Sequence, residues 1–224
     1  IIISLSVIDL VLVNNQIIEP DKNSYRQSTM TKNSFQLSYL QTDEVIRFLK
    51  QDKSQYRILP LQPLQNENRW SAFHIESIEG YHPAKIFRYN KVKDEVGWNS
   101  LGVLQMLNVK YIISQKDLSH PAFEHVFYGK LLHQGKYVNT HVYQFKYFMP
   151  RYFFVHQLEN ISDIDSQLQI LKQSDFNPLS LSFVEHDPQK FIYNTDAKVE
   201  IIHWSPNKIE FQLDAPTKQF MVIS

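Results

Sequence analysis

Cysteine is absent from this chain of 224 residues. Its absence excludes structural disulfides, thiolate nucleophiles and cysteine-bound zinc or iron–sulfur centres. Glycine is also scarce, because the chain contains only five glycines and none of them forms a glycine-rich loop that cradles phosphate. Nucleotide binding through a known loop is therefore not supported.

The chain also lacks a charge excess of either sign. Lys plus Arg and Asp plus Glu are balanced at 23 each, so no global field attracts nucleic acid or an anionic membrane surface. We predict no nucleic-acid partner. Hydrophobic residues make up 43% and aromatic residues 13% of the sequence, which predicts a folded domain with a substantial core.

Motifs for metal binding and catalysis are missing as well. The nine histidines form no HxH or HExxH pair, and no GxSxG turn is present. We predict no metal, no cofactor and no catalytic residue in this chain. A soluble hydrolase remains a third possibility, which would need a convergent carboxylate pair from a group of four residues: Glu76, Glu79, Asp94 and Glu95.

The most apolar run covers residues 1–13. As a helix it would extend roughly 20 Å, which is too short to cross a hydrocarbon core of about 30 Å. Two interpretations remain: a buried β-strand, or the end of a truncated transmembrane helix. The first residue is isoleucine, which suggests a piece of a longer protein, and the resemblance described below favours the helix.

The first half of the chain alternates helical and extended patterns. Residues 14–41 form a connector rich in Gln, Asn and Ser, and Thr42 caps the helix that follows it. The remaining predicted elements are helices at 42–52, 83–92 and 100–108 and strands at 56–61 and 109–114.

The second half is mostly extended. Ser162 and Asp165 resemble a capping box at the start of one helix. The predicted elements are that helix, 162–173, and strands at 137–147, 152–155, 198–204, 209–213 and 220–223, the last three forming a meander.

The fold class predicted from these elements is α/β (α+β). It has an N-terminal mixed α/β portion packed on a β-rich, mostly antiparallel C-terminal portion. The predicted organisation has four parts: the apolar run at 1–13, the connector at 14–41, an α/β domain at 42–150 and the β-rich portion at 151–224. The resemblance described below implies that the first part is the end of a truncated transmembrane helix and that the α/β domain is extracytoplasmic.

One stretch gathers two cations, a histidine and two tyrosines: Tyr81, His82, Lys85, Arg88 and Tyr89. If Pro83 starts a helix, Lys85 and Arg88 lie on one face of it. Such a cluster can bind a phosphate or a sugar phosphate. The structural alternative is equally strong: the tyrosines pack, and the cations are solvated or paired with nearby carboxylates.

Asn108 and Lys110 follow a predicted helix end and complete the candidate substrate-binding set. Their structural alternative is an asparagine that ends the helix and a lysine on the exposed face of a strand. Trp70, Trp98 and Trp204 can serve as sugar platforms, although single tryptophans are more often core or rim residues.

Several short segments occur together in one order: Asp9-Leu10, Tyr56-Arg57-Ile58, Gly80 to Lys85 followed by Arg88 and Tyr89, and Leu107 to Tyr111. In this order they resemble the extracytoplasmic part of the YfhO-type family of bacterial multi-pass membrane proteins. The sequence departs from the family pattern at Glu79, where a second glycine is common, and at Pro83, where a small residue is common.

The resemblance implies a parent protein similar to lipid-linked sugar glycosyltransferases of the GT-C type, which act on envelope glycans or teichoic acids. Its catalytic carboxylate would lie in a loop outside this chain, so the domain would be accessory. The implied location is the extracytoplasmic side of the bacterial cytoplasmic membrane, and the implied partners are a lipid-linked sugar or an envelope glycan. The alternative is a non-enzymatic glycan-binding or assembly module.

Overall fold

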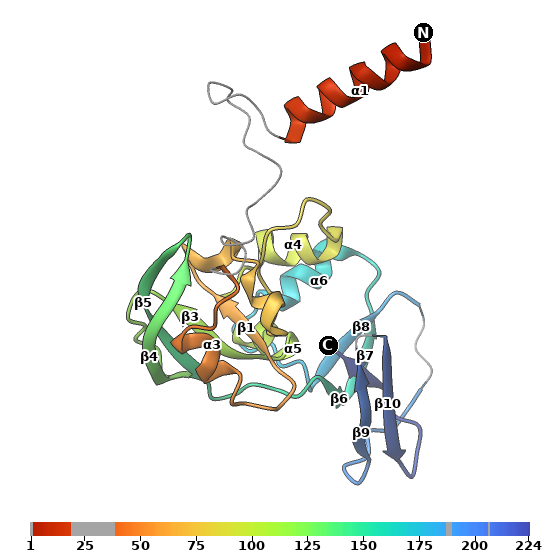
Figure 1. Ribbon diagram of the computed structural model, residues 1–224. Coiled ribbons are helices and arrows are strands. Elements are labelled where there is room, and N and C mark those ends of the chain that lie inside the picture. The colour runs from red at the N-terminus through yellow and green to blue at the C-terminus, as the bar shows by residue number, and fades with distance from the viewer. Residues whose placement is uncertain (1, 19–38, 187–189, 206) are drawn as a thin grey trace. The chain divides into compact units, whose positions relative to one another are not determined.

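The computed structural model describes residues 2–18, 39–186, 190–205 and 207–224, and divides the chain into two compact units, Ile1–Thr42 and Asp43–Ser224 (Figure 1). In the first unit, α1 (Ile2–Ile18) is one helix of 17 residues. The strand interpretation of residues 1–13 is therefore wrong, and the helix continues through residues 14–18 of the expected connector. Residues 19–38 of that connector lie outside the described part.

The described part of α1 has apolar side chains exposed within its unit, among them Leu5, Leu10 and Val11 at 61% each. At about 1.5 Å per residue, a helix of this length extends about 25 Å. Among the described residues, no helix combines the length and the apolar character that a membrane crossing requires.

The second unit is built on a mixed five-stranded sheet with the order β2-β1-β3-β5-β4. The strands are β1 (Arg57–Pro60), β2 (Glu76–Ser77), β3 (Val109–Ser114), β4 (Phe123–His133) and β5 (Lys136–Phe145). β1 pairs in parallel with both β2 and β3, whereas β5 pairs antiparallel with β3 and β4. The predicted strands 56–61, 109–114 and 137–147 correspond to β1, β3 and β5.

β4 was not predicted from the sequence. A β-bulge between His125 and Phe127 interrupts the two-residue alternation that identifies a strand. The turn into β5 is formed by Gln134 and Gly135, both with positive φ, the pair of left-handed residues that a tight hairpin requires.

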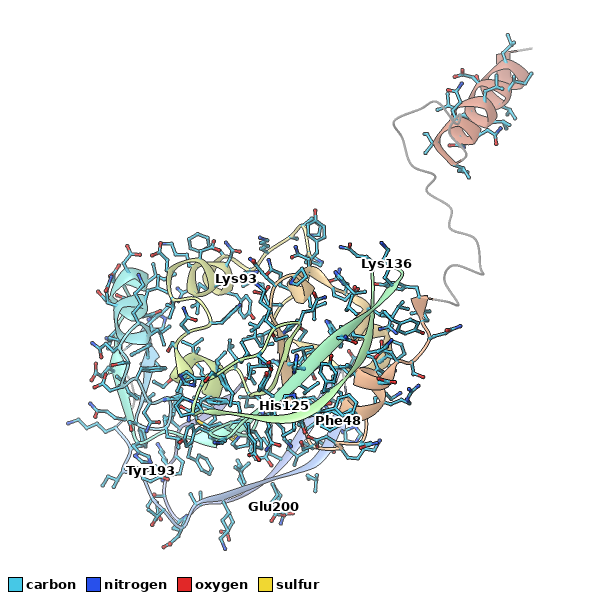
Figure 2. The ribbon with its side chains drawn as sticks, turned by 90° about the vertical axis from the view of Figure 1, so that its left-hand side faces the viewer. Phe48, Lys93, His125, Lys136, Tyr193 and Glu200 are labelled. Atoms are coloured by element: carbon cyan, nitrogen blue, oxygen red, sulfur yellow. The ribbon has the colours of Figure 1, made fainter. Side chains whose placement is uncertain are left out.

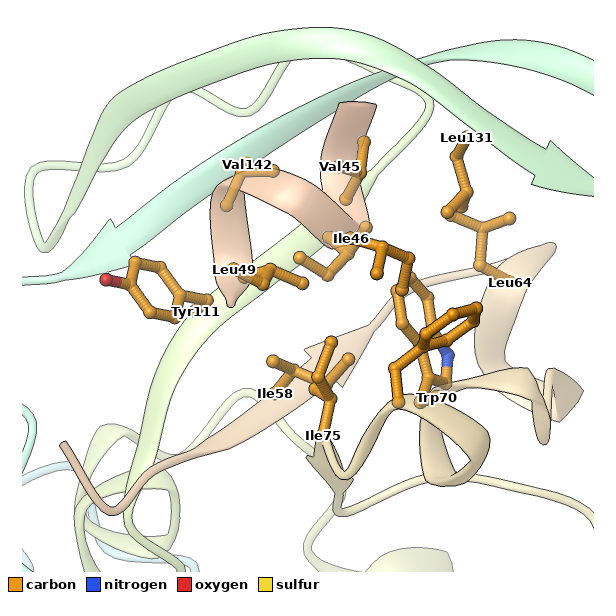
Figure 3. Close-up of a cluster of buried hydrophobic side chains, with 12 residues drawn as sticks. Val45, Ile46, Leu49, Ile58, Leu64, Trp70, Ile75, Tyr111, Leu131 and Val142 are labelled. Carbon is orange, nitrogen blue, oxygen red and sulfur yellow. The ribbon is translucent and has the colours of Figure 1, made fainter. Parts of the chain in front are cut away.

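Helices cover both faces of this sheet. α3 (Glu44–Leu49) packs on one face, where Ile58, Trp70 and Ile75 point toward its apolar side chains (Figure 3). α5 (Leu101–Met106) packs on the other face, where Leu104 meets Ile112 and Tyr143. Because both faces are covered, β3 is buried along nearly its whole length.

Within the second unit, the C-terminal portion packs on the N-terminal α/β portion through α6 (Ile164–Leu171). This helix lies beside α4 (Phe87–Glu95) in Figure 1. Leu168 and Leu171 join Val103 of α5 in a common apolar cluster. Ion pairs add to this contact, since Lys91 Nζ lies 3.0 Å from Asp165 Oδ1. The mixed helix and strand content and the β-rich second half confirm the predicted α+β class.

Six short strands form the rest of this portion. They are β6 (Tyr152–Phe154), β7 (Gln157–Asn160), β8 (Leu181–Val184), β9 (Lys198–Ser205), β10 (Lys208–Asp214) and β11 (Met221–Ile223). β9 and β10 form an antiparallel hairpin, but β11 pairs with β6, so the predicted three-stranded meander is wrong. β7 and β8 are parallel. Burial of Phe153 and Val155 against Phe220 and Val222 explains why β11 leaves the hairpin.

Three predicted helix starts differ from the structure. Asp43, and not Thr42, caps α3, because its Oδ1 accepts from the Ile46 amide at 2.9 Å. Asp163, and not Ser162, caps α6 in the same way. α4 begins at Phe87 rather than Pro83, since residues 83–84 form a turn in which the Ala84 amide donates to His82 Nδ1.

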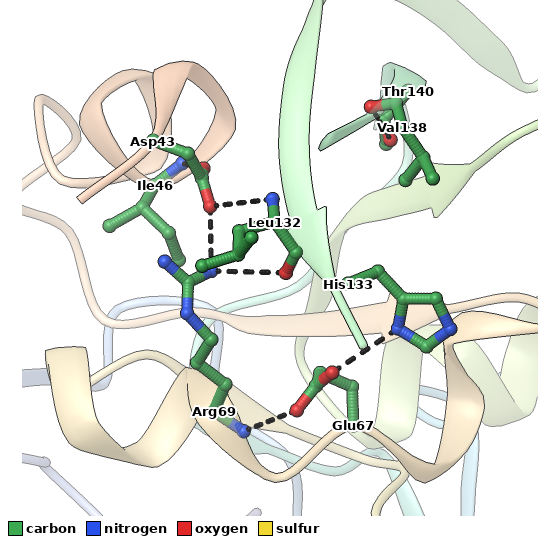
Figure 4. A network of polar contacts seen from close by, with 8 residues as sticks. All are labelled: Asp43, Ile46, Glu67, Arg69, Leu132, His133, Val138 and Thr140. Atoms are coloured by element: carbon green, nitrogen blue, oxygen red, sulfur yellow. Dashed lines mark hydrogen bonds and ion pairs between the residues drawn. The ribbon is translucent and has the colours of Figure 1, made fainter. Parts of the chain in front are cut away.

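Short 3-10 helices connect β1 to β2: η1 (Leu64–Asn66) and η2 (Arg69–Phe73). η2 carries a buried ion pair with the helix cap. Arg69 Nη1 lies 2.6 Å from Asp43 Oδ2, and both side chains are 1% exposed (Figure 4). The same Asp43 oxygen accepts from the Leu132 amide of β4 at 3.1 Å. One carboxylate therefore joins α3, η2 and β4.

Asp43→Asn should destabilise the chain by about 3–5 kcal/mol, because it leaves the Arg69 charge buried without its counter-charge. Asparagine still caps a helix, so the loss would not come from the cap. Urea unfolding measures the difference in free energy.

The matched control is Asp163→Asn, which changes an exposed helix cap in the same way but faces no buried arginine. It should leave the unfolding midpoint nearly unchanged. Equal losses in the two variants would show that the ion pair is not what Asp43 contributes.

Candidate functional site

A cavity of about 1370 Å³ opens at the parallel edge of the five-stranded sheet. Its walls come from β1, β2, η2, the loop 78–86, the start of α4 and the β9–β10 hairpin. We call it the arginine cleft, after two of its lining residues, Arg57 and Arg151. A pocket for a small ligand usually measures about 300–1000 Å³, so this cleft has room for more than one sugar ring.

Two arginines share one carboxylate in the arginine cleft. Glu76 is the register partner of Arg57 across the parallel β1–β2 pair, and Arg151 precedes β6. Glu76 Oε2 lies 3.5 Å from Arg57 Nε and 2.8 Å from Arg151 Nη2. The three side chains therefore carry one positive charge in excess.

The other partners of Arg57 are neutral. Its Nη1 donates to the Leu107 carbonyl at 3.2 Å and to Ser224 Oγ at 2.9 Å. Burial lowers the pKa of the Arg57 guanidinium from its ordinary value, and the charge of Arg151 lowers it further. The charge of Glu76 acts in the opposite direction and raises that pKa.

Arg151 is the more buried of the two, with its side chain 6% exposed. Its guanidinium carbon lies 5.0 Å from the centre of the Trp204 ring, a cation–π contact with the β9–β10 hairpin. Within the part of the chain that the structure describes, Arg151 Nε and Nη1 are buried and have no hydrogen-bond partner.

On a second wall of the arginine cleft, the charged side chains are paired with one another. Glu79 is 6% exposed and accepts from Lys93 Nζ at 2.5 Å and from Trp98 Nε1 at 2.6 Å. Lys93, labelled in Figure 2, reaches Glu79 from α4. Tyr89 donates to the Ile78 carbonyl at 2.5 Å, and burial, followed by the Glu79 charge, raises its pKa to about 12.

The loop 78–86 presents an exposed aromatic ring to the arginine cleft. The Asn68 side chain holds the backbone of Tyr81 through two hydrogen bonds of 2.8 Å, whereas the Tyr81 side chain is 67% exposed. Gly80 has φ +154°, and a Cβ there would lie 2.9 Å from Asn68 Oδ1. Glycine at position 80 therefore allows Asn68 to hold the Tyr81 backbone while the Tyr81 ring stays exposed.

Four of the seven candidate binding residues line the arginine cleft: Tyr81, His82, Lys85 and Tyr89 on its loop and helix wall. Arg88 does not line it and pairs with Glu185 instead. Lys85 precedes α4, so the expected shared helix face with Arg88 is not formed.

Asn108 and Lys110 lie outside the residues that line this cleft. Asn108 is fully buried with φ +56°, and its Nδ2 donates to the Met149 carbonyl at 2.6 Å, which fits the helix-terminating alternative. Lys110 Nζ lies 2.6 Å from Asp52 Oδ2 and 4.8 Å from the centre of the Phe148 ring.

Sequence reasoning missed the residues that give the cleft its charge: Arg57, Glu76 and Arg151 were not among the candidate binding residues. The available signal was an arginine between apolar neighbours, within the predicted strand 56–61 at Arg57 and directly before the predicted strand 152–155 at Arg151. Such a residue is buried only if it finds a partner. The partner, Glu76, belongs to a strand of two residues that no periodicity can reveal.

Among the described residues, no group of three or more His, Cys, Asp or Glu side chains could hold a metal ion. His125 and His141 lie close together, with ring nitrogens 3.1 Å apart, but they belong to no such group of three within the described residues. The arginine cleft is thus defined by cations and aromatic rings rather than by metal ligands.

Comparison with known proteins leaves the site to be argued from its own geometry. No protein-family model matches the chain, and no curated protein or solved structure matches it either. The resemblance to the YfhO-type family stays a prediction.

The Lys110 contact predicts an acid-sensitive part of the stability. Burial alone would raise the pKa of Asp52, but hydrogen bonds from Lys110, Ser54 and Tyr111 outweigh it and lower the pKa from 3.8 to about 2. A depressed pKa stabilises the fold above the unfolded value, and the contribution is lost as the pH falls through the folded value. Stability should therefore fall between about pH 4 and pH 2, as measured by urea unfolding.

Lys110→Met should reduce this acid-dependent loss because it removes the strongest hydrogen bond to the Asp52 carboxylate. Lys146→Met is the control, since Lys146 donates to the Pro121 carbonyl at 2.9 Å. An unchanged pH profile in Lys110→Met would refute the assignment.

Proposed function

We propose that this chain is the extracytoplasmic domain of a multi-pass bacterial membrane protein resembling lipid-linked sugar glycosyltransferases. It acts as an accessory part that binds a lipid-linked sugar or an envelope glycan, and the catalytic carboxylate lies outside this chain. One observation carries the binding part of the proposal: the arginine cleft combines fixed cations with aromatic rings that can stack on sugars.

The aromatic rings stand at different walls of the cleft. Trp204 belongs to the β9–β10 hairpin, and Tyr81 belongs to the loop 78–86. Sugar rings present apolar C–H faces that pack on aromatic rings, and their hydroxyls need donors and acceptors at the rim. Asn68, Ser71 and Asn90 also line the cleft and provide such groups.

An accessory role fits the state of the carboxylates better than hydrolysis does. Glycoside hydrolysis needs two carboxyl groups that face each other across the scissile bond. Glu76 is held by two arginines, and Glu79 by Lys93 and Trp98. The other two residues of the hydrolase hypothesis are also engaged: Asp94 accepts from Asn90, and Glu95 lies 3.2 Å from Lys172 Nζ.

Glycan binding should depend on the exposed ring of the cleft. Tyr81→Ala should weaken binding of oligosaccharides about tenfold, because stacking contributes roughly 1–1.5 kcal/mol. Saturation-transfer NMR of the whole chain with a panel of neutral and phosphate-containing oligosaccharides measures this.

The matched control is Tyr137→Ala, because Tyr137 is similarly exposed at 55% but lies on β5 away from the residues that line the cleft. It should bind like the unmodified chain. Equal weakening in both variants, or no binding of any glycan in the panel, would argue against the proposal.

The membrane part is tested by the reading frame that encodes this chain. Several spans of about 20 apolar residues are expected upstream of Ile1, with an acidic residue in the first outward loop. A start codon or a cleavable signal directly ahead of Ile1 would overturn this part and leave a free-standing glycan-binding module, the alternative function.

A further inference from the structure

The end of the arginine cleft formed by Arg57, Glu76 and Arg151 has an excess positive charge and guanidinium donors that have no partner among the described residues. Uncharged sugar hydroxyls would not neutralise this charge. We propose that these residues form a subsite for a phosphate group, carried as a sugar phosphate or a phosphodiester. The proposal rests on the proposed function for the glycan to which this phosphate is attached. We call these three residues the anion subsite.

The charges at the anion subsite favour one negative charge on the ligand. Guanidinium groups stay protonated at all physiological pH values, so Arg57 and Arg151 contribute two positive charges against the one of Glu76. Glu76 is also the most exposed of the three, with its side chain 44% exposed against 22% and 6% for the arginines. Its carboxylate is therefore well screened by water, while the arginine charges are less so.

The hydrogen bonds at the anion subsite are incomplete. Arg151 Nη2 donates to Glu76, but Nε and Nη1 have no acceptor among the described residues, which leaves three N–H groups unused. Buried donors in folded proteins nearly always have a partner. Phosphate oxygens are strong acceptors for guanidinium N–H groups, because both partners are charged.

Nearby carboxylates do not supply the missing acceptor. Glu79 is occupied by Lys93 and Trp98, and Glu67 lies 3.2 Å from His133 Nδ1 and accepts from the Arg69 amide. Lys85, on the loop 78–86, adds a further positive charge to the cleft lining. The unmet donors therefore point to an acceptor brought by a ligand.

Trp204 determines how a ligand reaches these donors. The Arg151 guanidinium carbon lies over the Trp204 ring, while the N–H groups point in the guanidinium plane. Stacking and hydrogen bonding can thus occur together. Because the Trp204 ring lies 5.0 Å from the Arg151 guanidinium carbon, an anion that binds this guanidinium should change the fluorescence of that tryptophan.

The test is a titration of the whole chain with inorganic phosphate, glycerol 3-phosphate and glucuronate, against sodium chloride at equal ionic strength. Binding is followed by tryptophan fluorescence and by the midpoint of thermal unfolding. We expect both phosphates to change the fluorescence and raise the midpoint. The fluorescence change should disappear in Trp204→Phe.

Three variants separate an anion site from a structural ion pair. Glu76→Gln removes the competing carboxylate and should tighten phosphate binding about fivefold or more, which a purely structural role would not produce. Arg151→Lys keeps the charge but loses the planar fork, and should weaken binding about tenfold. Lys136→Gln, at the turn between β4 and β5 (Figure 2) and outside the residues that line the cleft, is the control and should bind like the unmodified chain.

Some outcomes would overturn the anion subsite. These are no response to either phosphate in the unmodified chain and in Glu76→Gln, equal responses in Arg151→Lys and Lys136→Gln, or a response to glucuronate without one to phosphate. If Arg151→Lys does not fold, Arg57→Lys is used in its place. Binding of neutral oligosaccharides that depends on Tyr81 but not on phosphate would remove the anion subsite and leave the proposed function intact.

Discussion

The buried contact between Asp43 and Arg69 is the constraint on which much of the second unit depends. Burying two charges is costly, and the cost is offset only when each charge finds its partner and its remaining hydrogen bonds. Here the carboxylate also caps α3 and accepts from β4. The helix, the β1–β2 connection and the edge strand therefore have one relative arrangement in which both charges are satisfied.

The arginine cleft depends indirectly on this arrangement. η2, which carries Arg69, leads through Ile75 into β2, and β2 places Glu76 beside Arg57. Trp70 and Ile75 from the same connection are buried against α3 (Figure 3). The core that holds α3 to the sheet thus also fixes the edge at which the cleft opens.

The two arginine centres of this chain differ in a way that separates structure from binding. At Arg69, the ion pair is 1% exposed on both sides, and neither side chain is among the buried groups without a partner in the described residues. At Arg151, two guanidinium nitrogens have no hydrogen-bond partner among the described residues. A complete network stabilises a fold, whereas an incomplete one at a cavity has donors left for a ligand.

The candidate cluster at 81–89 was predicted in part from the local sequence pattern. The sequence placed tyrosines, a histidine and cations close together, and Tyr81, His82, Lys85 and Tyr89 do line one wall of the cleft. It did not predict that Pro83 and Ala84 form a bend, nor that the Asn68 side chain holds the Tyr81 backbone from another segment. A helix face was expected there, and a fixed loop was found.

By itself, the sequence determined the elements whose signals are local. The α+β class, the apolar stripes of α3, α5 and α6, and the strands β1, β3 and β5 follow from the spacing of apolar residues within each segment. Tertiary structure alone decided which distant segments meet: β11 on β6, and Arg57 with Glu76 and Arg151. The physical reason is that pairing between strands and sharing of a carboxylate depend on long-range packing, which leaves no periodic trace in the chain.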